Sequence, residues 1–380
     1  MDSVSFLLVA VILTALAFDF TNGFHDTANS MATSIATGAL SPRVAVAIAG
    51  VLNLAGAFLS TEVAKTISNG IVDDIKVSPV MIFAGLIGAI LWNLITWLVG
   101  LPSSSSHALF GGLIGAVWVG AGGSAVRFDA IFQKIVIPAV ASPVVACVVA
   151  MLATYLAYVI TRRAATRTVS KGFRAGQVGS ASLVALAHGT NDAQKTMGVI
   201  TLTLITGGVL GHGSGPPWWV VLSAGLAISL GTYAGGWRII RTMGKGLTDI
   251  QAPQGFAAET SATAVILASS HMGFALSTTQ VCTGSILGAG LGRKLAQVRW
   301  GIAGRIAASW LLTLPAAAAV GGVAAWVADQ GDGGVALVAG VALVAAVGFC
   351  VLSRRRPVNP DNVNELPAPE HAGDTVRSAA

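Results

Sequence analysis

The fold is decided by a short polar stretch, Asn22-Gly23-Phe24-His25-Asp26-Thr27-Ala28-Asn29-Ser30, that interrupts an apolar segment. Residues 4–18 before it are almost entirely apolar, and residues 31–40 after it are again small and mostly apolar. An ionisable pair such as His25 and Asp26 is costly if it faces lipid, so it must face protein or a wet cavity. We therefore expect this stretch to lie inside a bundle of membrane-spanning helices.

The same pattern recurs in the second half of the chain, as His188-Gly189-Thr190-Asn191-Asp192-Ala193-Gln194-Lys195-Thr196-Met197. Gly189 and Asp192 match Gly23 and Asp26 of the first stretch. Polar interruptions at matching places in two halves are the best pointer in a sequence to the binding site of a transporter. We expect each of the two stretches to break its helix.

The composition is that of a protein that lies mostly in lipid. Of the 380 residues, 54% are hydrophobic and only 10% are charged, whereas soluble domains carry about 25% charged residues. The apolar runs predict an all-α integral membrane protein of the cell membrane, with about 10–12 membrane segments. The net charge of +6 sits in loops without interleaved aromatic residues, so no nucleic-acid partner is expected. Three scattered cysteines indicate neither a disulfide framework nor a metal site.

Basic loops give the organisation of the chain, because loops rich in Lys and Arg remain in the cytoplasm. Counting crossings between these loops lets the first polar stretch enter the membrane from outside and the second from inside. The halves are therefore expected to be two inverted-topology repeats, as in many secondary transporters. The expected division is residues 1–160 for repeat 1, 161–176 for a basic cytoplasmic linker, 177–328 for repeat 2, 329–353 for a final transmembrane helix and 354–380 for a disordered cytoplasmic tail.

A second pair of motifs is rich in Ser and Thr, and each copy precedes a Gly-rich apolar run. We expect two re-entrant hairpins whose tips lie at the N-termini of half-helices. Free backbone N–H groups and the positive end of the helix dipole favour an anion there. Two tips that meet in the middle of the membrane would cradle a tetrahedral oxyanion. Aligning the two Gly-rich runs gives the tip residues as Ser104, Ser105 and Ser106 in the first half and Ser277, Thr278 and Thr279 in the second.

The carboxylates and amides of the duplicated stretch are candidates for a cation site. Asp26 and Asn29 are three residues apart, so one helical turn places them on the same face. Asn191 and Asp192 are their counterparts in the second half. Carboxylate and amide oxygens suit Na⁺, a proton relay or a divalent cation, and the residues leave this choice and the identity of any metal open. The alternative is that each Asp only caps a half-helix, and that the hydroxyls only cap helices or pack.

With both motif pairs in place, the chain resembles the PiT family of inorganic phosphate transporters, of the bacterial low-affinity type. The match runs from about Phe18 to Gly292, in both halves and in order. The resemblance implies a secondary active transporter that imports phosphate by cation symport and alternating access. It assigns the six hairpin-tip residues to phosphate and Asp26, Asn29, Asn191 and Asp192 to the coupling cation. It implies neither enzymatic activity nor catalytic residues, and no cofactor.

Departures from the family pattern bear on the coupling ion. His25 stands where the family usually has Asn, and Lys195 stands where the second motif often has Asn. A lysine ammonium could fill a cation site permanently, and a histidine changes its charge between about pH 5 and 8. These residues favour H⁺ over Na⁺, with phosphate carried as a neutral metal complex in which Mg²⁺ is part of the substrate. The alternative is that Lys195 only neutralises an Asp. Glu259 opens a span and is either a further coupling residue or a solvated interfacial acid.

Other functions remain open at this stage. A sulfate transporter of the same family would share the motifs, and a passive anion channel would share the pore. Whether the chain works alone or as a homodimer is also open. An intramembrane hydrolase is disfavoured, because the sequence contains no H-E-x-x-H and no G-x-S-x-G motif.

Overall fold

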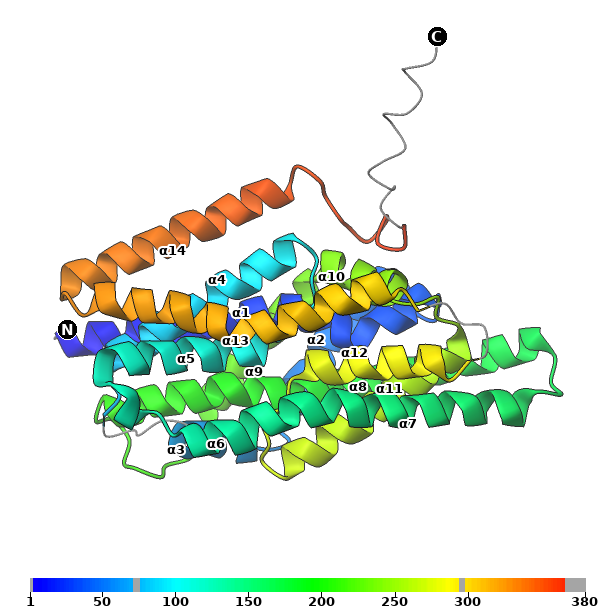
Figure 1. Cartoon of the computed structure of the whole chain (residues 1–380), viewed down its shortest axis with the longest axis horizontal. Helices are drawn as coiled ribbons and strands as arrows, with labels where there is room; N and C mark the ends of the chain where they lie inside the picture. Colours follow the sequence, from blue (N-terminus) through cyan, green and yellow to red (C-terminus); the bar gives the residue numbers. More distant parts are fainter. Residues whose placement is uncertain (1–2, 71–75, 294–297, 366–380) are drawn as a thin grey trace, which may run out of the picture.

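The protein is a bundle of helices aligned roughly along one axis (Figure 1). The computed structural model describes residues 3–70, 76–293 and 298–365, and every extended regular element within them is helical, which confirms the predicted class. The helices are α1 (Ser3–Ala36), α2 (Pro42–Ala57), α3 (Glu62–Gly70), α4 (Pro79–Leu98), α5 (Ser105–Ala121), α6 (Phe128–Ile131), α7 (Ile137–Thr161), α8 (Thr166–Thr206), α9 (Trp218–Ala234), α10 (Trp237–Arg241), α11 (Ala252–His271), α12 (Thr278–Leu291), α13 (Trp300–Ala328) and α14 (Asp332–Ser353).

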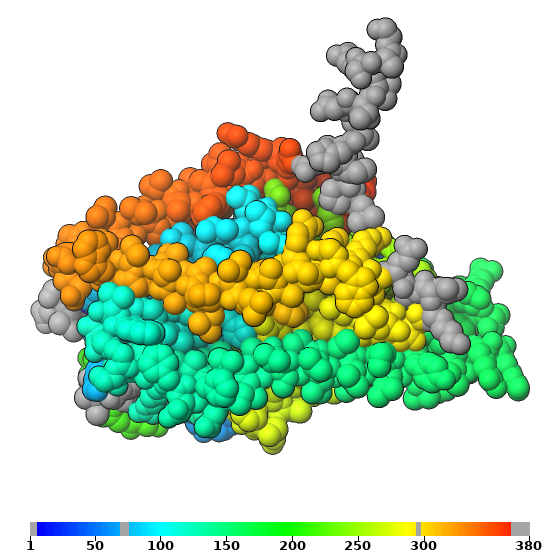
Figure 2. Space-filling view, in the orientation of Figure 1, coloured from blue at the N-terminus to red at the C-terminus, as the bar shows by residue number. Residues whose placement is uncertain are grey.

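Within the described residues, five helical segments are long and apolar enough to cross a membrane. They are α1, α4, the continuous run Phe128–Thr161, α13 and α14, and the bent pairs α2–α3 and α9–α10 raise the number to seven. The predicted number, about 10–12 segments, also includes α8 and α11, which carry polar residues, and the short helices α5 and α12. At one edge of the bundle, α14 packs mainly against α4 and α13, and most of its large side chains are exposed (Figure 2).

The prediction that the polar stretches break their helices is wrong. Both α1 and α8 run unbroken through their motifs. Hydroxyl groups there bond to the helix itself: Thr27 donates to the Gly23 carbonyl at 2.8 Å, and Thr190 donates to the Leu186 carbonyl at 2.8 Å. These two hydroxyl groups therefore find partners without any opening of the backbone. The expected boundary between linker and repeat 2 also falls inside α8.

Two hairpins enter the bundle as predicted. In the first, α4 leads to the short α5, and in the second, α11 leads to the short α12. Ser104 caps α5 by accepting the His107 N–H at 3.1 Å, and Ser277 caps α12 by accepting the Gln280 N–H at 3.3 Å. Each short helix packs against the long helix that follows the other hairpin: α5 packs on α13, and α12 packs on α7. This exchange of equivalent partners favours the predicted inverted repeat.

Close helix crossings position α1 and α8. A Cβ atom at Gly23 would overlap the backbone of α9 at Ile228, and one at Gly189 would overlap the backbone of α2 at Asn53. Only glycine permits these approaches, which bring both motif helices to the centre of the bundle.

We expect Gly23→Ala to lower the unfolding free energy by about 1–3 kcal/mol, because an overpacked crossing must move apart. Thermal unfolding of the purified protein in detergent measures this loss. Gly172→Ala on the exposed part of α8, where nothing lies within 4 Å of the added Cβ, is the control. Equal melting temperatures for the two variants would contradict the crossing argument.

The basic helix α10 and the start of α13, which follows Arg299, lie toward the end of the bundle at which α7 leads into α8 (Figure 1). Arg299 donates to the Lys245 carbonyl at 2.7 Å, and Arg238 donates to the Ser353 carbonyl at 2.8 Å. This common end agrees with the predicted cytoplasmic side. The first part of the tail is ordered rather than disordered, because Val363 is buried and Arg241 donates to the carbonyl oxygen of Asn362 at 3.2 Å. Residues 366–380 of the predicted tail lie outside the described residues.

Candidate functional site

The central site lies where the two hairpin tips meet the middles of α1 and α8. All thirteen residues predicted for the phosphate and cation sites are buried, with at most 5% of each side chain exposed. Twelve of them belong to this one cluster, and Glu259 lies elsewhere. The structure thus brings together side chains from four helices that are far apart in the sequence.

Asp26 joins α1 to both hairpin tips. Its Oδ2 accepts a hydrogen bond from Ser105 of the first tip at 2.7 Å, and its Oδ1 accepts one from Thr279 of the second tip at 3.2 Å. Asn29, one turn along the same face, donates to Thr279 at 3.1 Å and to Thr278 at 3.3 Å. The predicted common face of Asp26 and Asn29 is therefore confirmed.

Asp192 has the equivalent place on α8. Its Oδ1 accepts from Lys195 Nζ at 2.5 Å and from Asn191 at 2.8 Å, and its Oδ2 accepts from Thr278 at 3.1 Å. Lys195 Nζ also donates to the Ser106 hydroxyl at 2.5 Å. The ammonium group therefore bridges the α8 carboxylate and the first hairpin tip, at the position where α1 carries Asn29.

Two histidines accompany the carboxylates. His25 Nδ1 lies 2.6 Å from Asp26 Oδ1, while its Nε2 lies 3.2 Å from the Thr96 hydroxyl of α4. His188 Nε2 lies 3.2 Å from Asp192 Oδ2, and its Nδ1 lies 3.2 Å from Asn53 Oδ1 of α2. Each histidine thus contacts the carboxylate of its own half of the site.

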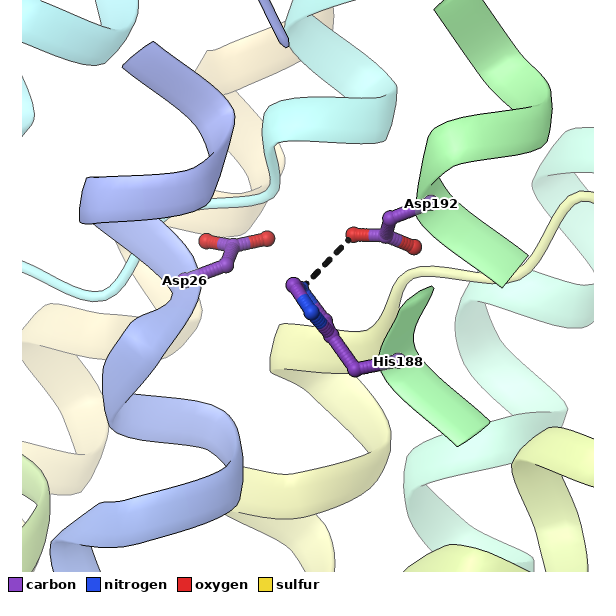
Figure 3. A group of neighbouring side chains, drawn as sticks. All are labelled: Asp26, His188 and Asp192. Carbon is purple, nitrogen blue, oxygen red and sulfur yellow. Dashed lines mark ion pairs between the residues drawn. The ribbon is translucent and has the colours of Figure 1, made fainter. Parts of the chain in front are cut away.

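Asp26, Asp192 and His188 form the core of the cluster. Figure 3 shows the two carboxylates pointing toward one another from α1 and α8, with His188 between them. One ligand atom from each lies within 4.8 Å of the others. Such a set of oxygen and imidazole ligands could hold a cation that arrives with an anion. The side-chain amide oxygen of Asn29 also has no hydrogen-bond partner among the described residues.

Glu259 lies in a separate buried cluster toward the basic end. Its carboxylate accepts hydrogen bonds from Thr33 at 2.6 Å, Ser180 at 2.5 Å and Gln177 at 3.1 Å. The alternative of a solvated interfacial acid is therefore wrong, since only 3% of the residue is exposed. Thr33 is seven residues beyond Asp26, which places this cluster about 10 Å further along α1.

Several site residues were missing from the predicted set. His188 opens the second polar stretch but was not among the predicted site residues, although it contacts Asp192. Thr96 and Ser270 end the two helices that precede the tips, and they contact His25 and Asn191 at the equivalent places. Thr96 lies eight residues before Ser104 and Ser270 lies seven residues before Ser277, and this similar spacing from the tips was a signal that could have identified them.

An all-helical membrane bundle that encloses a charged and hydroxyl-rich centre is typical of a multi-pass membrane transporter. The chain matches the model of the phosphate transporter family over residues 22–169 and 159–321. It belongs to this family, whose members are transporters and not enzymes, and it is a multi-pass protein of the cell membrane.

Named relatives agree with this membership. A probable low-affinity inorganic phosphate transporter of Mycobacterium leprae is 55% identical over 95% of this chain and 88% of its own length. A protein of the same description from Bacillus subtilis is 41% identical over 87% of this chain and 99% of its own length. A solved structure described as the sodium-dependent phosphate transporter has a TM-score of 0.77 at 26% identity, covering 85% of this chain and 99% of that one.

Proposed function

We propose that this protein imports inorganic phosphate together with a cation, and that phosphate binds between the two hairpin tips. The observation that carries the proposal is the meeting of Ser105, Ser106, Thr278 and Thr279 at two helix N-termini, with Asp26 and Asp192 beside them. Hydroxyl and backbone N–H groups at such N-termini favour an oxyanion. Family membership and the names of the relatives support phosphate as that anion.

The charges at the centre require a cation to accompany the anion. With neutral histidines, Asp26, Asp192 and Lys195 sum to a charge of −1, so a phosphate anion would enter a site that already repels it. Protonation of His25 and His188, or a bound metal ion, reverses the sign. Burial makes an uncompensated charge very costly, which favours symport over passage of the bare anion.

Several features favour H⁺ as the coupling ion, with Mg²⁺ entering as part of the substrate. Lys195 occupies a place equivalent to Asn29 and supplies a fixed positive charge beside Asp192. His25 contacts Asp26, which is the counterpart of Asp192 on α1. The solved relative is described as sodium-dependent, so Na⁺ is the competing coupling ion.

Phosphate is favoured over sulfate by the two carboxylates. Hydrogen phosphate carries a proton at neutral pH that a carboxylate can accept as a hydrogen bond, whereas sulfate carries none. A site with buried acceptors rejects a ligand that leaves them unpaired. Competition by sulfate for labelled phosphate tests this preference directly.

The burial of the whole site fits alternating access. No predicted site residue is more than 5% exposed, so the conformation is occluded from both sides of the membrane. Opening toward either side must then separate helices, such as a hairpin tip from α1 or α8. The cluster around Glu259 lies between the centre and the basic end, where such a separation would open the inner path.

Uptake of labelled phosphate into proteoliposomes tests the proposal, with pH, Na⁺ and Mg²⁺ varied in turn. We expect an inward proton gradient to drive accumulation without Na⁺, and Mg²⁺ to increase it. Accumulation driven only by Na⁺ would identify Na⁺ instead of H⁺ as the coupling ion and would still support symport. Phosphate flux that ignores both ion gradients would contradict symport and favour a passive channel.

A further inference from the structure

One buried carboxylate remains unused by the central site. Asp19 lies on α1, seven residues before Asp26, and none of its surface is exposed. Neither of its oxygens has a hydrogen-bond partner among the residues that the structure describes. Seven residues of α-helix correspond to about 10 Å, so Asp19 lies on the side of the central site opposite Glu259.

Other polar groups around Asp19 also lack partners. The Thr196 hydroxyl of α8 and the Asn22 side chain of α1 are fully buried and near enough to interact with the Asp19 carboxylate. Within the described ranges, no hydrogen bond is made by the Thr196 hydroxyl or by either polar atom of the Asn22 side chain. A carboxylate, an amide and a hydroxyl thus meet in the interior with unused oxygen ligands.

An ionised carboxylate in this position needs a positive partner. The charged groups that act on Asp19 are Asp192, which repels it, and Lys195, which is already bonded to Asp192 and Ser106. Besides α8, the helices that pack most extensively against α1 are α9 and α4, and neither contains an acidic or basic residue. Burial of an isolated charge costs far more than one hydrogen bond can return.

We infer that Asp19, Asn22 and Thr196 form a second site for a monovalent cation, on the outer side of the phosphate site. The inference rests on the proposed symport. The ligand is H⁺ on the carboxylate or Na⁺ among the three oxygens, and both neutralise Asp19. Because Lys195 and Asp192 act on Asp19, a cation bound there also changes the electrostatic potential at the centre before phosphate enters.

The site also gives the two ends of the path different chemistry. Asp19 lies toward the N-terminal end of α1, which is the predicted outer end. Glu259 lies toward the basic end, and both of its carboxylate oxygens accept hydrogen bonds, from Thr33, Gln177 and Ser180. An incoming cation would therefore meet unsatisfied ligands on the outer side first.

Asp19→Asn tests the inference in proteoliposomes, with two arms. One arm varies the outside pH in the absence of Na⁺, and the other varies Na⁺ at fixed pH. We expect the variant to transport one cation fewer per phosphate in whichever arm drives the wild-type protein. The half-saturating cation concentration for uptake should rise at least about tenfold, corresponding to about 1.4 kcal/mol. Equilibrium binding of labelled phosphate in detergent should persist.

Thr196→Val gives an independent test that preserves shape. Loss of one neutral oxygen ligand should raise the half-saturating cation concentration about fivefold, corresponding to about 1 kcal/mol. Thr201→Val is the matched control, because the Thr201 hydroxyl is equally buried on α8 but bonds to the Met197 carbonyl of its own helix at 2.7 Å.

The outcomes separate this inference from the proposed function. If the wild-type protein shows no cation-driven phosphate uptake, symport fails and the second site fails with it. If the wild-type protein is cation-driven but Asp19→Asn keeps the same cation-to-phosphate ratio, only the second site is overturned. An unchanged cation affinity in Thr196→Val would likewise overturn it, even if Asp19→Asn fails to fold.

Discussion

Asp26→Asn is expected to reduce phosphate uptake at least about 100-fold, because the variant loses charge-assisted hydrogen bonds worth about 1.5–3 kcal/mol each. The carboxylate accepts from Ser105 and Thr279 at the two hairpin tips and contacts His25. The neutral amide keeps the shape of the side chain but has only one acceptor oxygen. It also removes the negative charge that a proton or metal ion would neutralise.

The measurement is the initial rate of labelled phosphate uptake into proteoliposomes under the gradient that drives the wild-type protein. Asp249→Asn is the control, because its carboxylate is 62% exposed and pairs with Arg299 at 3.0 Å outside the central site. Such an exposed pair contributes about 0–1 kcal/mol. Uptake by Asp26→Asn within about threefold of the control would contradict a role for the carboxylate in coupling and favour a passive channel.

The sequence was sufficient to predict the central site because its residues recur. Asp26 and Asp192, like Ser105 and Thr278, stand in matching places of two halves. A duplicated arrangement in an apolar chain has few explanations other than a shared interior. The structure brings these side chains within hydrogen-bonding distance of one another, although their assignment to phosphate and cation remains a prediction.

The continuity of α1 and α8 could not be predicted, because the local sequence does not show which partners a polar group finds in the folded chain. Gly23 and Gly189 looked like interruptions, but they permit close crossings with α9 and α2. The hydroxyl groups of Thr27 and Thr190 donate hydrogen bonds to backbone carbonyls of their own helices. Those contacts satisfy polar groups inside the membrane without unwinding the helix.

Asp19, which sequence reasoning missed, lacks a counterpart in the other half. Ala185 is the α8 residue at the place that Asp19 has on α1, so duplication does not single out Asp19. The tail is another case, since its order depends on contacts from Arg238 and Arg241 that are more than a hundred residues away in the sequence. Only the folded chain places these groups together.

Lys195→Ala is expected to abolish phosphate uptake and to lower the unfolding free energy by about 3–5 kcal/mol, since it leaves Asp192 buried without its ammonium partner. The pair is fully buried, with Nζ 2.5 Å from Asp192 Oδ1. Uptake and thermal unfolding are both measured. Lys65→Ala is the matched control. Lys65 pairs with Glu62 at the same three-residue spacing, with Nζ 2.8 Å from Glu62 Oε1, but its side chain is 50% exposed.

Lys195→Asn then decides what the ammonium group does, because it places on α8 the residue that α1 carries at Asn29. If Lys195 substitutes for a bound cation, the Asn variant should regain uptake relative to Lys195→Ala and should require Na⁺, with half-saturation that the wild-type protein does not show. If Lys195 only neutralises Asp192, the Asn variant should remain as inactive as the Ala variant at every Na⁺ concentration. Phosphate uptake measured against Na⁺ at fixed pH distinguishes these two roles, since a mobile cation can replace the fixed charge only where the surrounding oxygens can bind it.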